Sequence, residues 1–430
     1  MFLFGKSKRN DPKALRSGTV ERVSSRMFAV PSDPATILNH AELRKKLQDT
    51  DELTFGQAVE APFTVTYKGI EYVFDTADVE YGVEEDDPAI GALSEAERGI
   101  VLHADHALGV EVMFADNNMD SYHLQIKLLH MLVPDMAALF DSNAYRAHSG
   151  RWVRMTATSK VAPSPDYMFT IHAVNDNEEG TDSVWLHTHG LTRCGTIELE
   201  ILGASLNNWR DLGNTLNQIA HRLVGDNRFI DEMEPKLMGR TSDGRDIVVT
   251  WQRSEWSFKD FPKKIVGGPS DRNEEHSLNM GVIYLYVKEE DQLDGKITPI
   301  NQWADALSEN AIFFKTTSET QRMRALAQER VNWLRVLDRE LPEKDIIIKI
   351  GLKPDPEQGF DDDQFEYIWF RADELREDGF TATLTQDAFY VNGMVEGVQR
   401  ECRYDEIVDW RVITEDDSYS PDNIYKYVKE

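Results

Sequence analysis

Apolar and polar residues alternate along several segments of the first 225 residues, and between these segments apolar residues recur every three to four positions. Alternation predicts strands, because successive side chains of a strand point to opposite faces, and the longer period predicts amphipathic helices. Strands are predicted at 27–30, 63–67, 71–74, 110–114, 136–140, 167–174, 183–191 and 196–202. Helices are predicted at 34–48, 94–106, 124–132 and 212–225, and the second begins with a capping box, Ser94-Glu-Ala-Glu97.

Short strands dominate the rest of the chain. Residues 226–340 contain predicted strands at 246–252 and 281–287 and a helix at 318–339. After a linker at 341–343, strands are predicted at 346–350, 366–372, 379–384, 389–391, 401–404 and 410–413. Short strands separated by turn residues indicate a small β-barrel or a curled sheet.

These elements together indicate an α+β fold, in which helices pack on an open mixed or antiparallel sheet and a small β-rich, barrel-like module follows. We expect four parts: a basic flexible leader at 1–26, an α+β domain at 27–225, an α+β subdomain at 226–340 that ends in the long helix, and an acidic β-rich module at 345–430. The sequence has no GxGxxG motif and no P-loop, so no motif supports a nucleotide-binding fold.

Motifs in the last part resemble a bacterial domain of unknown function, the YegJ-like family. The motifs are Glu366-Tyr-Ile-Trp-Phe370, Phe380-Thr-Ala-Thr-Leu384, the Gly393/Gly397 turn and Ile407-Val-Asp-Trp410. Ala382 stands where many members have glycine. The stretch from Trp185 to Gly190, with Gly195 and Glu198, is similar to the N-terminal domain that accompanies this module. The resemblance covers residues 25–430 and implies a bacterial cytosolic protein, without implying an activity.

Charge changes the expected class of partner. The net charge is −29, which argues against nucleic acid, because nucleic-acid binding depends on Lys and Arg displacing counterions from phosphates. The charge is also uneven, since residues 343–430 hold ten Lys/Arg against twenty-three Asp/Glu, a net of −13. Such a surface either keeps the protein in solution or steers it to a basic partner.

The two cysteines and the hydropathy pattern bear on the compartment. Cys194 and Cys402 lie far apart and offer neither a zinc-ligand spacing nor a disulfide framework. No run of about 18 apolar residues occurs, so no membrane span is expected. Basic residues follow Met1-Phe-Leu-Phe4 almost at once, which is unlike a signal peptide. We therefore expect a reduced, cytoplasmic protein.

Imidazoles and carboxylates are spaced to meet on one surface in the predicted hairpin of 183–191 and 196–202. Alternation puts Trp185, His187 and His189 on one face of the first strand. Matching the apolar faces requires paired positions with an odd sum, and a loop at 192–195 gives 387. His189 then faces Glu198 and His187 faces Glu200, with Trp185 at the edge of the patch.

Two interpretations fit this patch. Two histidines and a carboxylate on one face are suitable ligands for zinc, iron or manganese, so His187, His189, Glu198 and Glu200 are candidate metal ligands. Alternatively, the residues form ordinary cross-strand pairs that stabilise the sheet. An even sum of paired positions would turn the histidines toward Ile197 and Leu199 and remove the metal site.

The sequence favours a binding protein over an enzyme, although it does not exclude catalysis. Cys194, beside Arg193, is the only candidate nucleophile, and no cofactor motif is present beyond the possible divalent metal. We expect an interaction protein that uses its acidic surface, such as an immunity-type antagonist of a basic partner protein, with Trp185 and Tyr390 as candidate partner-binding aromatics. The alternative is a metal-dependent hydrolase or metal-binding protein built on the His/Glu hairpin.

Overall fold

The computed structural model describes residues 20–428, except 34, 37, 39, 57–61, 176–181, 226–230, 273–275, 277–279, 309–310, 316 and 359–364. The described chain divides into two compact units. Unit 1 contains residues 20–157 and 164–315, and unit 2 contains residues 158–163 and 317–428. Most of the predicted leader lies outside the described residues. Its last part is fixed in unit 1, where the Val20 N–H donates to the Gly195 carbonyl at 3.0 Å.

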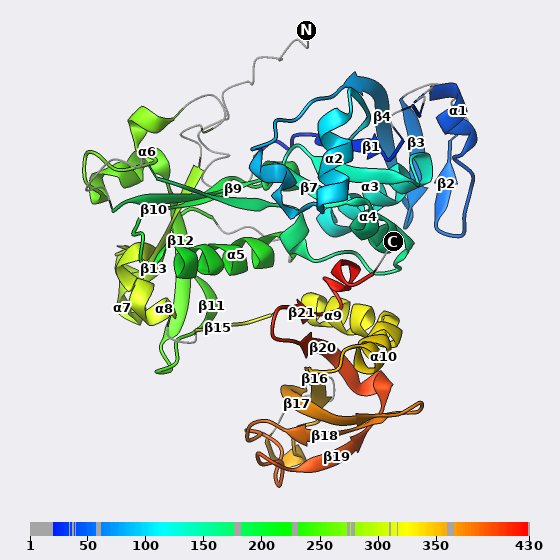
Figure 1. The fold of residues 1–430 in the computed structure, drawn as a ribbon. Helices are drawn as coiled ribbons and strands as arrows, with labels where there is room; N and C mark the ends of the chain where they lie inside the picture. The colour runs from blue at the N-terminus through cyan, green and yellow to red at the C-terminus, as the bar shows by residue number, and fades with distance from the viewer. Residues whose placement is uncertain are drawn as a thin grey trace. The chain divides into compact units, whose positions relative to one another are not determined.

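The first sheet of unit 1 is antiparallel and has seven strands in the order β2-β3-β4-β5-β1-β6-β7 (Figure 1). The strands are β1 (Ser25–Pro31), β2 (Leu53–Phe55), β3 (Phe63–Tyr67), β4 (Ile70–Glu80), β5 (His106–Val112), β6 (Met136–Asp141) and β7 (Arg146–Ser149). Its helices are α1 (His40–Lys45), α2 (Glu95–His103), α3 (Asn118–Leu132) and α4 (Gly150–Thr158).

Local sequence signals account for two features of this sheet. Lys68 and Gly69 both have positive φ, 49° and 79°, which suits the two-residue turn of the β3–β4 hairpin. The Ser94 hydroxyl accepts the Glu97 N–H, and the Glu97 carboxylate accepts the Ser94 N–H, so the predicted capping box begins α2. The hairpin and the start of the helix are therefore confirmed.

The second sheet of unit 1 is mixed, because β10 and β13 run parallel while the other pairs are antiparallel. Its order is β15-β11-β12-β13-β10-β9-β8, and β14 also pairs with β13. The strands are β8 (Thr170–Val174), β9 (Val184–His189), β10 (Glu198–Ala204), β11 (Lys236–Arg240), β12 (Asp246–Arg253), β13 (Met280–Tyr286), β14 (Thr298–Pro299) and β15 (Ile312–Phe313).

Helix α5 (Trp209–Gly225) packs against β8, β9 and β10 of the second sheet. The apolar repeat at Leu212, Leu216, Ile219 and Leu223 forms its buried face, as the sequence predicts. Every residue of β9 is buried. Side chains that alternate along this strand therefore enter the interior on both faces of the sheet. The short helices of this part are α6 (Ser254–Ser257), α7 (Glu289–Asp294) and α8 (Ala304–Ser308).

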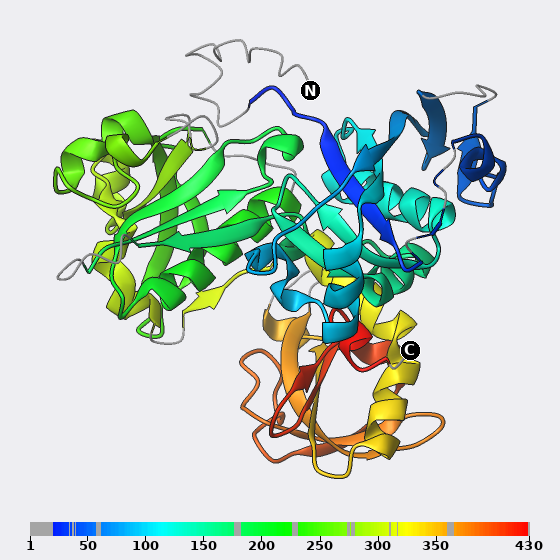
Figure 2. The ribbon, with the colours of Figure 1, turned by 45° about the horizontal axis from the view of Figure 1, so that its top comes forward.

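Unit 2 contains a six-stranded antiparallel sheet in the order β19-β18-β17-β16-β20-β21. The strands are β16 (Asp345–Leu352), β17 (Glu366–Leu375), β18 (Phe380–Leu384), β19 (Gln399–Cys402), β20 (Ile407–Ile413) and β21 (Ser418–Tyr419). Helices α9 (Thr317–Glu329) and α10 (Val331–Glu340), drawn in yellow, pack against β20 (Figures 1 and 2). The indole N–H of Trp410 donates to the Ala327 carbonyl at 3.3 Å.

The predicted α+β class is confirmed, with three corrections of detail. No sheet in the described chain closes into a barrel, so the C-terminal sheet is open. The predicted helix at 318–339 is two helices, which meet at Arg330. The predicted strand at 389–391 is a turn. None of the helices in the described residues is both long and apolar enough to cross a lipid bilayer.

Candidate metal centre

Three histidines from two paired strands lie together in unit 1. His172 on β8 is the Cα partner of His187 on β9, and His189 lies two residues further along the same face of β9. One ring nitrogen from each of the three lies within 4.8 Å of the others. The Nε2 atoms of His187 and His189 are 3.1 Å apart. In a tetrahedral zinc site with Zn–N bonds of about 2.05 Å, two ligand nitrogens lie about 3.3 Å apart.

The cluster is largely removed from solvent. His187 is fully buried, His189 is 9% exposed and His172 is partly buried. Burial disfavours the imidazolium, and the neighbouring histidines disfavour it further. The pKa of His187 is therefore lowered to about 2, that of His189 to about 3, and that of His172 also falls. All three rings are neutral at pH 7, which is the form that binds metals.

Aromatic rings surround these imidazoles. Trp185 stacks on His187 with ring centroids 4.0 Å apart, and Tyr145 contacts His189 edge-on at 4.7 Å. A fourth imidazole, His276, lies 4.8 Å from His187 and 5.2 Å from His189 between centroids. In addition, Nδ1 of the fully buried His187 has no hydrogen-bond partner in the described residues. A buried polar atom without a partner is costly, so its presence marks this cluster as unusual.

The predicted register of the hairpin is correct at its centre, where Glu200 is the Cα partner of His187. The Glu200 carboxylate is nevertheless bound elsewhere. It accepts the Trp185 indole N–H at 2.7 Å and pairs with the Arg272 guanidinium at 2.9 and 3.1 Å. It also accepts the hydroxyl of Ser254. Burial raises the pKa of Glu200, although Arg272 opposes that shift. Glu200 thus positions Trp185 and Arg272 and is not among the clustered ligands.

Glu198 closes the turn of the hairpin. Its carboxylate accepts the Thr188 hydroxyl at 2.7 Å and the N–H groups of Gly190 and Thr192 at 3.1 and 3.0 Å. Alternation puts Thr188 on the face of β9 opposite to His187 and His189. The predicted pairing of His189 with Glu198 is therefore not formed. Burial raises the pKa of Glu198 to about 7, despite these hydrogen bonds.

The structure separates the other predicted residues. Trp185 is only 3% exposed, so its role is to pack on His187 and not to present an aromatic surface to a partner. Tyr390 is 43% exposed, in unit 2. Cys194 is fully buried, and burial raises the pKa of its thiol to about 12 despite the adjacent Arg193. A buried neutral thiol is a poor nucleophile, which removes the candidate for covalent catalysis.

Two histidines of the cluster were missed from the sequence. His172 lies in a predicted strand, 167–174, and alternation within that strand was the available signal. His276 comes from the loop before β13 and carries no local signal. Its position depends on the parallel pairing of β10 with β13, which brings that loop to the hairpin.

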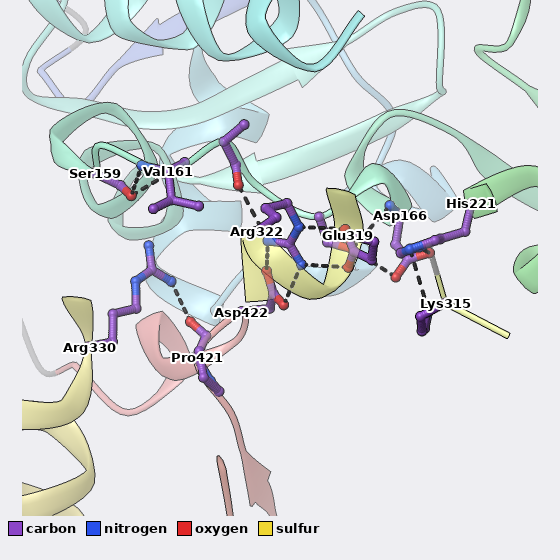
Figure 3. A network of polar contacts seen from close by, with 12 residues as sticks. Ser159, Val161, Asp166, His221, Lys315, Glu319, Arg322, Arg330, Pro421 and Asp422 are labelled. Atoms are coloured by element: carbon purple, nitrogen blue, oxygen red, sulfur yellow. Dashed lines mark hydrogen bonds and ion pairs between the residues drawn. The ribbon is translucent and has the colours of Figure 1, made fainter. Parts of the chain in front are cut away.

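A second polar network in unit 1 surrounds Asp166 (Figure 3). Asp166 accepts from Asn217 at 3.0 Å and is 2.8 Å from Nδ1 of His221, whose Nε2 lies 3.4 Å from Nζ of Lys315. The Ser164 hydroxyl donates to Asp166 at 3.0 Å. A serine nucleophile would instead donate to the histidine, so the order of these contacts is that of a structural network and not of a catalytic triad.

Comparison with known protein families places both parts of unit 1. Residues 25–163 match DUF4026 N-terminal, and residues 171–284 match DUF4026 C-terminal, two domains of a protein of unknown function. No curated protein and no solved structure matches the chain. The resemblance to the YegJ-like family is not confirmed. His172, His187, His189 and His276 all lie within the second matched domain. The chain therefore belongs to the DUF4026 family and carries both its N-terminal and its C-terminal domain.

Proposed function

We propose that this protein binds one divalent transition-metal ion through His172, His187 and His189. The observation that carries the proposal is the convergence of three largely buried, neutral imidazoles, with one nitrogen of each within 4.8 Å of the others. The ligand set differs from that expected from the sequence, since His172 takes the place of Glu198 and Glu200.

The donor chemistry selects the class of metal. Imidazole nitrogen suits zinc, copper, nickel and iron, whereas magnesium and calcium require oxygen ligands. With Glu200 paired to Arg272 and Glu198 bonded to the turn, no carboxylate of the hairpin competes for the ion. We therefore expect zinc, copper or nickel to bind and magnesium and calcium not to bind.

Three protein ligands leave one position of a tetrahedral site for a fourth group. His276 is the nearest described imidazole outside the three, at 4.8 Å from His187 between ring centroids. Burial of His187 and His189 favours a structural or metal-sensing role over hydrolysis, since a hydrolase must admit a substrate beside its metal. Metal-dependent hydrolysis remains the second candidate function.

Metal content and affinity of the full-length chain test the proposal. We expect about one equivalent of metal in the purified protein, and a His187→Ala/His189→Ala variant that binds zinc at least about 100-fold more weakly. The matched control is His103→Ala/His106→Ala, a second histidine pair of unit 1 outside the cluster. Circular dichroism confirms that each variant is folded. A wild-type chain that competes for no zinc against a chelator contradicts the proposal, as does equal loss of binding in the control.

A further inference from the structure

We propose that the loop at 385–398 of unit 2, together with Phe365 and Tyr367 at the start of β17, docks a basic partner segment that carries an apolar side chain. This site is separate from the histidine cluster and does not depend on metal binding. We call it the aromatic loop surface.

Aromatic side chains are concentrated at this surface. Seven aromatic residues are exposed in the described chain, and four of them are Phe365, Tyr367, Phe389 and Tyr390. Phe389 is 80% exposed. The two segments are neighbours, because the Glu366 carboxylate accepts the N–H groups of Phe389 and Tyr390 at 2.7 and 2.9 Å. Exposed aromatic rings gathered in one place mark interaction sites more often than scattered ones do.

The loop is held in one conformation although it lacks regular secondary structure. Besides the two bonds to Glu366, Asp355 accepts the Asn392 N–H at 2.6 Å and Asp387 accepts the Glu396 N–H at 2.8 Å. The Asp355 N–H donates in turn to the Tyr390 carbonyl at 2.9 Å. A fixed loop loses little conformational entropy on binding, so its exposed rings are preorganised for contact.

Charge decides what the surface binds. The loop contains Asp387 and Glu396 and no Lys or Arg, and Asp355 and Glu366 lie directly against it. A basic segment complements these carboxylates, and its Lys or Arg side chains gain further from lying over the exposed rings. An anionic membrane and a second copy of this chain, which has a net charge of −29, are both repelled.

Selection from a displayed library of random peptides, with full-length protein as bait, tests the proposal. We expect the enriched peptides to combine net positive charge with an aliphatic or aromatic residue and to bind more weakly as salt increases. A Phe389→Ser/Tyr390→Ser variant should bind them at least about 10-fold more weakly. The carboxylate bonds of the loop end on backbone N–H groups, so this variant keeps them.

The matched control is Leu293→Ser, which removes an 87% exposed apolar side chain from unit 1 and should leave binding unchanged. A second variant, Asp387→Asn/Glu396→Gln, should weaken binding and reduce its salt dependence. Failure to enrich peptides overturns the proposal, and so do enriched peptides that are neutral or acidic. Equal binding to Phe389→Ser/Tyr390→Ser, or binding of the wild type to anionic lipid vesicles that this variant loses, overturns it as well.

Discussion

Single buried residues set the pH response of unit 2. Asp409 on β20 is 7% exposed, and burial raises its pKa to about 6, although Arg411 opposes the shift. Its Oδ1 accepts the N–H of Trp410 at 2.9 Å, while the Trp410 indole N–H goes to Ala327. An unfolded aspartate titrates near 4, so between pH 4 and 6 the folded state binds more protons than the unfolded state. The stability of unit 2 therefore falls as pH rises through this range.

We predict that Asp409→Asn stabilises unit 2 at pH 7.5, by about 1–3 kcal/mol, because the amide keeps an acceptor for the Trp410 N–H without a buried charge. The gain should shrink as the pH is lowered to 4.5, where folded Asp409 is protonated. Urea unfolding at both pH values measures the difference. An equal gain from Asp378→Asn, an exposed aspartate of the same unit, would show that the effect is one of net charge.

At the scale of elements, alternation within strands predicted more than the pairing between strands that are distant in the sequence. The pairing of His187 with Glu200 followed from the apolar faces of β9 and β10, because both signals lie within one hairpin. His172 and His276 were missed, because their positions depend on the pairing of β9 with β8 and of β10 with β13. Sequence spacing contains no measure of such pairings.

The break between α9 and α10 shows another limit of sequence patterns. The apolar period continues through residues 318–339, and no proline or glycine interrupts it. The structure ends α9 at Glu329, and the Arg330 guanidinium donates to the Pro421 carbonyl at 2.5 Å. A tertiary contact with a residue 91 positions away accompanies the break, so local propensity did not predict it.

The loop before β13 is fitted closely to the metal centre. Gly267 has a φ of +82°, and a Cβ there would lie 2.4 Å from the Trp185 ring, which stacks on His187. We predict that Gly267→Ala lowers stability by about 1–3 kcal/mol and weakens zinc binding, because Trp185 must move. Gly244→Ala is the control, since Gly244 has a φ of +86° with open space around it. Zinc titration of both variants separates the clash from backbone strain. Equal weakening by both contradicts the prediction.

At the scale of the whole molecule, each unit has its own buried ion-pair network. In unit 1, Arg193 from the 3₁₀ turn η4 (Thr192–Cys194) donates two bonds of 2.7 Å to Asp141 at the end of β6, and both side chains are fully buried. This pair joins the two sheets of unit 1. In unit 2, Arg322 on α9 pairs with Glu319 and with Asp422, as Figure 3 shows. Arg322 also donates to the Ala162 carbonyl at 3.3 Å.

We predict two calorimetric unfolding transitions, one for each unit, because each unit has its own hydrophobic core. Arg193→Ala should lower only the transition of unit 1, by about 3–5 kcal/mol, since it leaves the Asp141 carboxylate buried without a partner. Arg322→Ala should lower only the other transition. Arg26→Ala, which removes an exposed pair with Glu111, should change stability by less than about 1 kcal/mol. A single transition that both buried substitutions shift contradicts the prediction.

The two cysteines give each unit an internal clock. Cys194 lies in unit 1 and Cys402 in unit 2, and burial raises their thiol pKa values to about 12 and about 11. Alkylating reagents attack thiolates, so each sulfur reacts only when its own surroundings open. Mass spectrometry of the two labelled peptides over time thus reads the opening rate of each unit separately, in one sample of unmodified protein and with no engineered probe.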